Sequence, residues 1–430
     1  MASVSKYKKE GYWRVMFCVD GYRTSKVIEA RTKKQAMTQA ALMEQSIRET
    51  GSIDGQVNND TGSSSVMFME FCDRYMDWCT TIRANPIRPK TEQKYRDIIN
   101  YHLKPYFRGI KLGQIKQVTV EGFIKYMRSP EARVNKTNKR AYSDATVKDA
   151  YTLLEAILKR AVQLELIRKN PCANVEKPTI KDRGPMAYYD DKQIVAMLRA
   201  LDKETNATLA KLAAMEEIGT YQPFTLQKEK VNTLYNRGMV YIAIHTAARR
   251  GEILGLHRQD IDFTNMTITF RHNVLYTRGQ GTFMEDTLKT VDSNTVAINE
   301  DLANLLKELI AEVDKLFTVS NGVIPYTDRL FMGLRRTTRQ EPGGLPFPDP
   351  YSDWFKLFLA RNNLPPITFH KLRHSSLSFM LHSGVDPFTV AKIAGHSSLE
   401  QIHKTYGHVY DEAMAQAANV FNRIKGGDKQ

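Results

Sequence analysis

Two histidines, His370 and His374, lie four residues apart in the segment ITFHKLRHSS and could bind a metal ion. On a helix this spacing places both imidazoles on one face, as in half of a zinc site. Arg373 stands between them, however, and a fixed cation beside a metal ion opposes its binding. The pair would also need a third ligand, and Lys371 occupies the place where HExxH zinc sites carry glutamate. We therefore expect no metal here and an anion as the ligand.

The start of this predicted helix is suited to an anion. Thr368 can cap the helix, which puts His370 and Arg373 about one turn apart near its N-terminus. That end carries free N–H groups and the positive end of the helix dipole. A second cationic group is Arg249 in HTAARRGEILGL, where Glu252 follows one turn later on what we expect to be the same helix.

Three further segments carry residues of related chemistry. Lys289 lies at the entrance of a predicted hairpin, LKTVDSNTVAI. In KIAGHSSLE, Gly395 is expected to end a helix and His396 to lie in the turn, before a capping box starts the next helix. Tyr406, in QIHKTYGHVY, falls near the end of that short helix.

Together these residue types predict phosphodiester transesterification. Two guanidinium groups can clamp the oxygens of one phosphate, and a lysine or histidine can protonate a leaving alkoxide. A tyrosine can act as the nucleophile and form a covalent phosphotyrosine. The motifs contain no acidic cluster of the kind that a magnesium or two-metal site needs. We therefore expect neither a metal nor another cofactor.

Five motifs in the C-terminal part resemble, in order and spacing, those of the tyrosine recombinases, the phage integrase family. They are TAARRGEILGL, LKTVDSNTVAI, HKLRHS, AGHSS and TYGHV. The resemblance extends by architecture to the rest of the chain, which is similar to integrases of conjugative transposons and phages that have an N-terminal arm-binding domain. It implies a site-specific recombinase that integrates or excises a mobile element through a Holliday junction.

The resemblance also implies a role for each motif residue. The scissile phosphate would be bound by Arg249 and Arg373, and Lys289 would protonate the 5′-oxygen leaving group. His370 would act as acid or base, and His396 would donate a hydrogen bond to the phosphate. Tyr406 would attack and become linked to the 3′-phosphate, while Glu252 would support the arginine motif from behind.

The sequence departs from the family pattern at several places. Ala247 follows Thr246 where the family commonly has glycine, and Arg250 directly follows Arg249, so that the register rests on Glu252. Asn294 stands where an arginine is usual, and the segment 205–227 resembles an insertion that interrupts the helices. Tyr410 is one helical step from Tyr406 but lies outside the TYxH pattern, and His374 is expected to support the site by packing.

The spacing of apolar residues predicts a mainly α fold with small β-sheets, divided into several domains, whose elements position these residues. Alternating residues and an Asp-Gly turn near the N-terminus predict a three-stranded sheet followed by a helix with Thr32 as its N-cap. Helical spacing of apolar residues dominates the next segment, in which Thr119 is a further predicted N-cap. With the roles that the resemblance implies, the domains are an arm-type DNA-binding domain (1–50), a linker (51–65), a helical core-site DNA-binding domain (66–174), a linker (175–185) and a catalytic domain (186–430) with a terminal protomer-docking helix (411–425).

The charge is unevenly distributed along the chain of 430 residues, whose net charge is +15. Residues 63–181 carry 23 basic and 12 acidic side chains, whereas residues 182–430 carry 29 and 28. An excess of cations in the N-terminal part indicates a clamp for a polyanion. The chain has no long apolar run, and its four cysteines form no CxxC pair, which indicates a cytosolic protein. The resemblance implies that this is the bacterial cytoplasm or nucleoid.

The resemblance implies that the partner is double-stranded DNA at core and arm sites, bound by a homotetramer on paired sites, and that no membrane takes part. An accessory excision or DNA-bending factor is a possible further partner. Two alternatives remain open from the residues: a DNA-binding regulator that does not cleave, and an enzyme that relaxes DNA like type IB topoisomerases.

Overall fold

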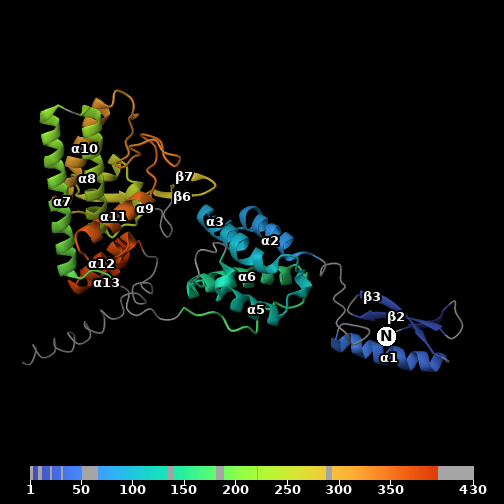
Figure 1. Ribbon diagram of the computed structural model, residues 1–430. Coiled ribbons are helices and arrows are strands. Elements are labelled where there is room, and N and C mark those ends of the chain that lie inside the picture. The colour runs from blue at the N-terminus through green and yellow to red at the C-terminus, as the bar shows by residue number, and fades with distance from the viewer. Residues whose placement is uncertain are drawn as a thin grey trace, which may run out of the picture. The chain divides into compact units, whose positions relative to one another are not determined.

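The computed structural model describes residues 3–7, 12–19, 22–30, 32–50, 66–133, 140–180, 188–219, 221–286 and 293–395 (Figure 1). The chain divides into two compact units, Met1–Asp182 and Arg183–Gln430. Most elements are helices and the sheets are small and antiparallel, as the sequence predicts. Within the described ranges, none of the helices combines the length and apolar character needed to cross a membrane.

The first elements of the chain form a three-stranded sheet covered by one helix (Figure 1). The strands are antiparallel in the order β1 (Ser3–Lys6), β2 (Tyr12–Val19) and β3 (Tyr22–Glu29), and α1 (Lys33–Thr50) follows. Val15 and Ile28 of the sheet bury their side chains against Ala36 and Ala40 of the helix. The predicted sheet-plus-helix unit is thus confirmed, and Thr32 accepts the Gln35 N–H over 3.2 Å as the predicted N-cap.

A helical bundle follows within the first unit. Its helices are α2 (Phe68–Asp77), α3 (Pro89–Ile98), α4 (Lys104–Phe107), α5 (Gln117–Met127) and α6 (Asp144–Gln163). Phe68, Phe107 and Phe123 meet in its core. The predicted cap at Thr119 is wrong, because α5 begins two residues earlier and the Thr119 hydroxyl accepts the Lys116 N–H over 3.2 Å from within the first turn.

The second unit is built around α8 (Pro223–Thr246). This helix contacts α7 (Asp191–Ile218), α9 (Arg250–Leu254), α10 (Glu300–Val319), α11 (Asp349–Arg361) and α12 (Phe369–His382) (Figure 1). A short helix, α13 (Pro387–Ile393), packs on α12. The segment 205–227 does not interrupt the helices as expected, because its first part extends α7 to Ile218 and its last part begins α8.

Two small sheets complete this unit. One has the order β4 (Ile261–Asp262), β5 (Thr267–Phe270) and β8 (Asn294–Ala297), and the other is the hairpin of β6 (Asn273–Thr277) and β7 (Gly281–Glu285). The predicted β4–β5 hairpin is confirmed, whereas the β6–β7 hairpin was not expected. Of the second predicted hairpin, β8 lies within the described residues, and it pairs with β5, Phe270 opposite Asn294.

Candidate active site

A sharp turn separates α8 from α9 at the first arginine motif. Ala247 has a φ of 52°, the left-handed conformation that ends a helix. Thr246 secures the turn, since its hydroxyl donates to the Ile242 carbonyl over 2.6 Å and accepts the Ala248 N–H over 3.3 Å. The expectation of one continuous helix through Arg249 is therefore wrong. The turn places Arg249 just before α9, as its N-cap residue.

Arg249 and Glu252 hold one another at the start of α9. The Glu252 carboxylate accepts the Arg249 main-chain N–H over 2.8 Å and the Arg249 Nη1–H over 2.7 Å. Glu252 is buried, whereas the Arg249 side chain is partly exposed. A carboxylate at this end of a helix is also favoured by the helix dipole. Glu252 thereby fixes the Arg249 guanidinium while leaving one side of it open to solvent.

Arg373, on α12, is buried beside the same turn, and the residue is only 4% exposed. Its Nη1–H donates to the Ala247 carbonyl over 2.7 Å, and its Nη2–H donates to the Ala394 carbonyl. One guanidinium therefore links the end of α8 to the end of α13. The predicted helix end there is confirmed, because α13 stops at Ile393 and Gly395 has a φ of 59°.

His370 lies in the first turn of α12 and keeps an exposed surface. Partial burial and the charges of Arg373, Arg249 and Lys371 lower its pKa. Thr368 is the residue before the helix, as predicted, but its side chain makes no capping hydrogen bond. The His374 ring meets the His370 ring edge-on, with 5.3 Å between the ring centres.

The structure therefore gathers four of the seven predicted site residues: Arg249, Glu252, His370 and Arg373. The other three, Lys289, His396 and Tyr406, lie outside the described residues, as do Tyr410 and the terminal helix predicted at 411–425.

Several residues that hold the site together were not predicted. The Ser376 hydroxyl donates to the Ile244 carbonyl over 2.6 Å and so ties α12 to the end of α8. Asn294, noted only as a departure from the family pattern, donates from its amide to the Ile393 carbonyl over 2.9 Å and ties β8 to α13. These bonds end on main-chain carbonyls, which every residue type possesses, so the sequence contains no signal for them.

The sequence matches the models of two known protein families. Residues 223–413 match the model of the phage integrase family, and residues 67–128 match that of the phage integrase N-terminal SAM-like domain. Together the two matches span more than half of the chain. This chain belongs to the phage integrase family. It is therefore a tyrosine recombinase, as the motifs predict.

Relatives of this integrase extend the similarity over nearly its whole length. The ICEBs1 integrase of Bacillus subtilis (strain 168) is 24% identical over 396 residues, which cover 92% of this chain and 91% of the relative. A XerC-like tyrosine recombinase of Caldanaerobacter subterraneus subsp. tengcongensis is 24% identical over 439 residues, covering 99% and 100%.

Solved structures share the fold of this integrase. The Tn1549 transposon integrase in complex with a circular intermediate DNA has a TM-score of 0.61 at 17% identity, over 83% of this chain and all of that one. A lambda integrase dimer bound to a COC′ core site has a TM-score of 0.50 at 15% identity, over 94% and 95%. The fold class is therefore that of the multidomain tyrosine recombinases.

Proposed function

We propose that this integrase is the site-specific recombinase of a mobile element, which cleaves and rejoins double-stranded DNA through a 3′-phosphotyrosine. The observation that carries the proposal is the pair of guanidiniums fixed beside His370. Arg373 is held by two carbonyls and Arg249 by a buried carboxylate, so both are oriented before a phosphate arrives. Orienting donors in advance is the main way in which proteins stabilise charge that develops in a transition state.

In the proposed reaction the Tyr406 hydroxyl oxygen attacks the scissile phosphorus, and the bond from phosphorus to the 5′-oxygen breaks. The leaving oxygen takes a proton from Lys289. The tyrosine proton passes to His370, whose lowered pKa keeps its imidazole neutral at physiological pH and able to accept it. Arg249 and Arg373, with His396, stabilise the charge on the non-bridging oxygens.

The same chemistry in reverse joins the strands. A 5′-hydroxyl attacks the phosphotyrosine and releases Tyr406, and the energy of the original phosphodiester is kept in the covalent link. Neither ATP nor a metal ion is required for this exchange.

The distribution of charge and the relatives support the domain roles that we propose. We assign residues 1–50 to arm sites, 66–174 to core sites and 186–430 to catalysis, joined by linkers at 51–65 and 175–185. The basic excess of residues 63–181 supports a DNA clamp in the core-site domain. Relatives with solved structures are bound to DNA, one as a dimer on a core site. The proposed working assembly is a tetramer on paired sites, with an accessory factor that controls direction.

A nicked suicide substrate tests the nucleophile. The wild-type chain should form a covalent adduct on its attachment site, whereas Tyr406→Phe should bind the DNA and form none. Tyr410→Phe is the matched control and should form the adduct normally. An adduct formed by Tyr406→Phe would rule out Tyr406, and chelation with EDTA should leave cleavage intact.

The same assay separates the alternatives. Site-specific binding without any adduct in the wild type would favour a non-catalytic regulator. Relaxation of a supercoiled plasmid that lacks an attachment site would favour a topoisomerase.

A further inference from the structure

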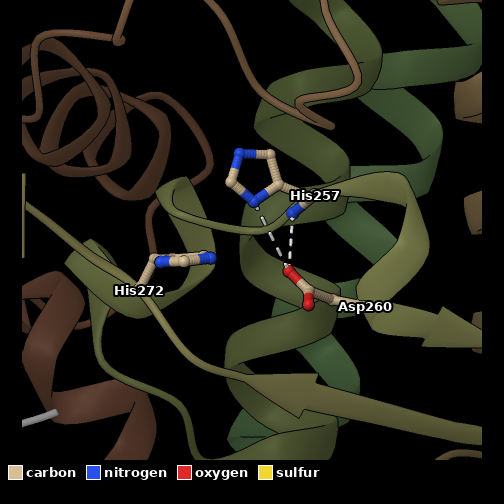
Figure 2. Close-up of side chains that lie close together, drawn as sticks. All are labelled: His257, Asp260 and His272. Carbon is tan, nitrogen blue, oxygen red and sulfur yellow. Dashed lines mark hydrogen bonds and ion pairs between the residues drawn. The ribbon is translucent and has the colours of Figure 1, made fainter. Parts of the chain in front are cut away.

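His257, Asp260 and His272 form a side-chain cluster to which the proposed recombination chemistry assigns no role (Figure 2). His257 follows α9, Asp260 ends the next short turn, and His272 lies between β5 and β6. One nitrogen or oxygen atom of each residue lies within 4.8 Å of the others. The first two residues are buried and the third is half-buried, so the cluster is enclosed by the second unit.

Two buried ring nitrogens of the cluster, His257 Nδ1 and His272 Nδ1, have no hydrogen-bond partner among the described residues. Among the residues that the structure describes, His257 Nδ1 makes no hydrogen bond, although it points at the Asp260 carboxylate from 3.8 Å (Figure 2). His257 is only 9% exposed. A buried nitrogen that lacks a partner costs about 1–3 kcal/mol. A ligand that accepts its lone pair would remove that cost.

The Asp260 carboxylate has one oxygen that faces the cluster and could bind the same ligand. Asp260 Oδ1 accepts a hydrogen bond from Arg271, whereas Oδ2 faces His257 and accepts its main-chain N–H over 2.9 Å. The remaining ring nitrogen of His272, Nε2, is directed toward the same space (Figure 2). Two imidazole nitrogens and one carboxylate oxygen therefore converge.

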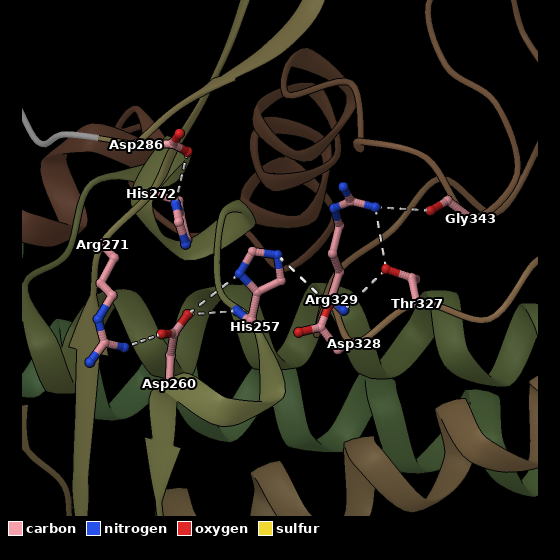
Figure 3. A network of polar contacts seen from close by, with 9 residues as sticks. All are labelled: His257, Asp260, Arg271, His272, Asp286, Thr327, Asp328, Arg329 and Gly343. Carbon is pink, nitrogen blue, oxygen red and sulfur yellow. Dashed lines mark hydrogen bonds and ion pairs between the residues drawn. The ribbon is translucent and has the colours of Figure 1, made fainter.

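Each histidine has a carboxylate at its outer nitrogen. His272 Nδ1 lies 3.3 Å from Asp286, and His257 Nε2 lies 3.9 Å from Asp328 (Figure 3). Metal-binding histidines commonly donate their second N–H to a carboxylate, which orients the ring and makes the other nitrogen a better ligand. In the part of the chain that the structure describes, neither outer nitrogen makes that hydrogen bond, but a carboxylate lies beside the outer nitrogen of each ring, on opposite sides of the cluster.

The local charges also favour a cation. Asp260, Asp286 and Asp328 surround the two rings, while the guanidinium of Arg271 lies on the far oxygen of Asp260. Arg329, the other nearby cation, turns its Nη1 toward Thr327 and the Gly343 carbonyl (Figure 3). The three carboxylates outnumber the two guanidiniums, so the net charge around the two rings is negative.

We propose that His257 Nδ1, His272 Nε2 and Asp260 Oδ2 bind a divalent transition-metal ion, with a water as the fourth ligand. Imidazole suits zinc and its neighbours in the first transition row. A tetrahedral zinc site with bonds near 2.05 Å separates its ligand atoms by about 3.3 Å. The 3.8 Å between His257 Nδ1 and Asp260 Oδ2 is wider by about half an ångström, and the three ligand atoms lie within 4.8 Å of one another, so binding requires side-chain rotations that draw all three inward.

The ion has a structural role, because it links the segment after α9, which carries His257, to the segment between β5 and β6, which carries His272. The backbone there is already closely packed: a Cβ on Gly251 would lie 2.1 Å from the Asn273 Oδ1, and a Cβ on Gly255 would lie 2.8 Å from the His272 carbonyl. Fixing His257 to His272 holds α9 on β6, and α9 begins at the residue after Arg249. The ion would stabilise the fold around Arg249 without contacting the phosphate, so cleavage below the melting temperature of the metal-free chain would not require it.

Zinc titration of the full-length chain without DNA tests the site. After treatment with a chelator and its removal, Zn²⁺ at about 100 times its Kd should raise the melting temperature by about 5–10 °C. Double substitution with His257→Gln and His272→Gln should abolish that rise and remove one bound zinc per chain. His102→Gln, a change of a half-buried histidine in the other unit, is the control and should preserve both. An unchanged melting temperature in the wild type, or a full rise in the double variant, would overturn the proposal.

The outer carboxylates allow a test that does not disturb the core. Asp286 and Asp328 are exposed, so Asp286→Asn and Asp328→Asn should fold normally and weaken zinc binding by about 10–100-fold. Asp314→Asn is the matched control, because Asp314 is as exposed as Asp328 but pairs with Arg258. Equal zinc affinity in all three variants would contradict the assignment. The readout involves no DNA, so its outcome is independent of the proposed recombinase activity.

Discussion

Arg373 donates a hydrogen bond from Nη1 to the main-chain carbonyl of Ala247 over 2.7 Å, across 126 residues of chain. Ala247 is the left-handed residue that ends α8, so the turn that releases Arg249 from the helix also presents the carbonyl that holds Arg373. The two arginine motifs are therefore coupled through one peptide group.

Replacing Arg373 by lysine should slow DNA cleavage by about 100–1,000-fold. The ammonium keeps the charge but cannot reproduce the planar fork that reaches two carbonyls and a phosphate. Single-turnover cleavage of a suicide substrate measures the effect, and DNA affinity should change much less. Arg361→Lys, at an exposed ion pair with Glu204, is the control. Cleavage by Arg373→Lys at the control's rate would show that the fork geometry is unimportant.

Glu252→Gln should destabilise the second unit by about 1.5–3 kcal/mol and slow cleavage. The amide can still accept one N–H, but the charged bond that fixes the Arg249 guanidinium is lost. Denaturant unfolding gives the stability and a suicide substrate gives the rate. Glu229→Gln breaks the exposed pair with Arg335 and should cost under about 1 kcal/mol. Equal losses in the two variants would argue against a special role for Glu252.

Lys371→Gln should move the acid limb of the cleavage pH profile to higher pH. The Lys371 charge is one of the causes that lower the His370 pKa, so its removal raises that pKa and protonates the imidazole earlier as the pH falls. The rate on the plateau should change little. Lys392→Gln, an exposed change on α13, should leave the limb in place. A limb that does not move in Lys371→Gln would mean that another group controls it.

Ala247→Val should destabilise the chain by at least about 2 kcal/mol more than Ala247→Gly. The left-handed conformation at this position is strained for any side chain and worst for a β-branched one, whereas glycine adopts it freely. Glycine loses the packing of one buried methyl group, so it should remain within about 1 kcal/mol of the wild type. Thermal unfolding of the two variants measures the difference. Similar stabilities would show that the turn relaxes to accept valine.

Deleting residues 1–62 should spare cleavage of core sites and impair integration. The small sheet and α1 have a core of their own, separate from that of the helical bundle, so the cut leaves the bundle intact. A suicide-substrate assay and an integration assay on paired attachment sites measure the two activities. Integration at the wild-type level would remove the proposed arm-site role.

Local patterns allowed much of the secondary structure to be predicted. The apolar residues at helical spacing from Val147 to Val162 fall on α6, and all of them except the half-buried Val162 are buried. Predictions failed where a local pattern was compatible with two different structures. The alanines around Ala247 favour a helix, but the turn is stabilised by Arg373 from a distant helix. Thr119 has the residue type of a cap, yet the helix begins earlier.

The residue types and motif order of the sequence by themselves predicted the chemistry, because a phosphate clamp needs arginines and a covalent intermediate needs a nucleophile. They also indicated the family to which the chain belongs. Only the tertiary structure decided how Arg249 and Arg373 are held, since carbonyls and a break in a helix leave no mark on residue identity. It likewise decided that His257 and His272 lie next to Asp260 in one enclosed cluster, although their separation of 15 positions in the sequence indicates no contact. Contacts between distant segments depend on how the elements pack, and packing is set by the whole core rather than by any short motif.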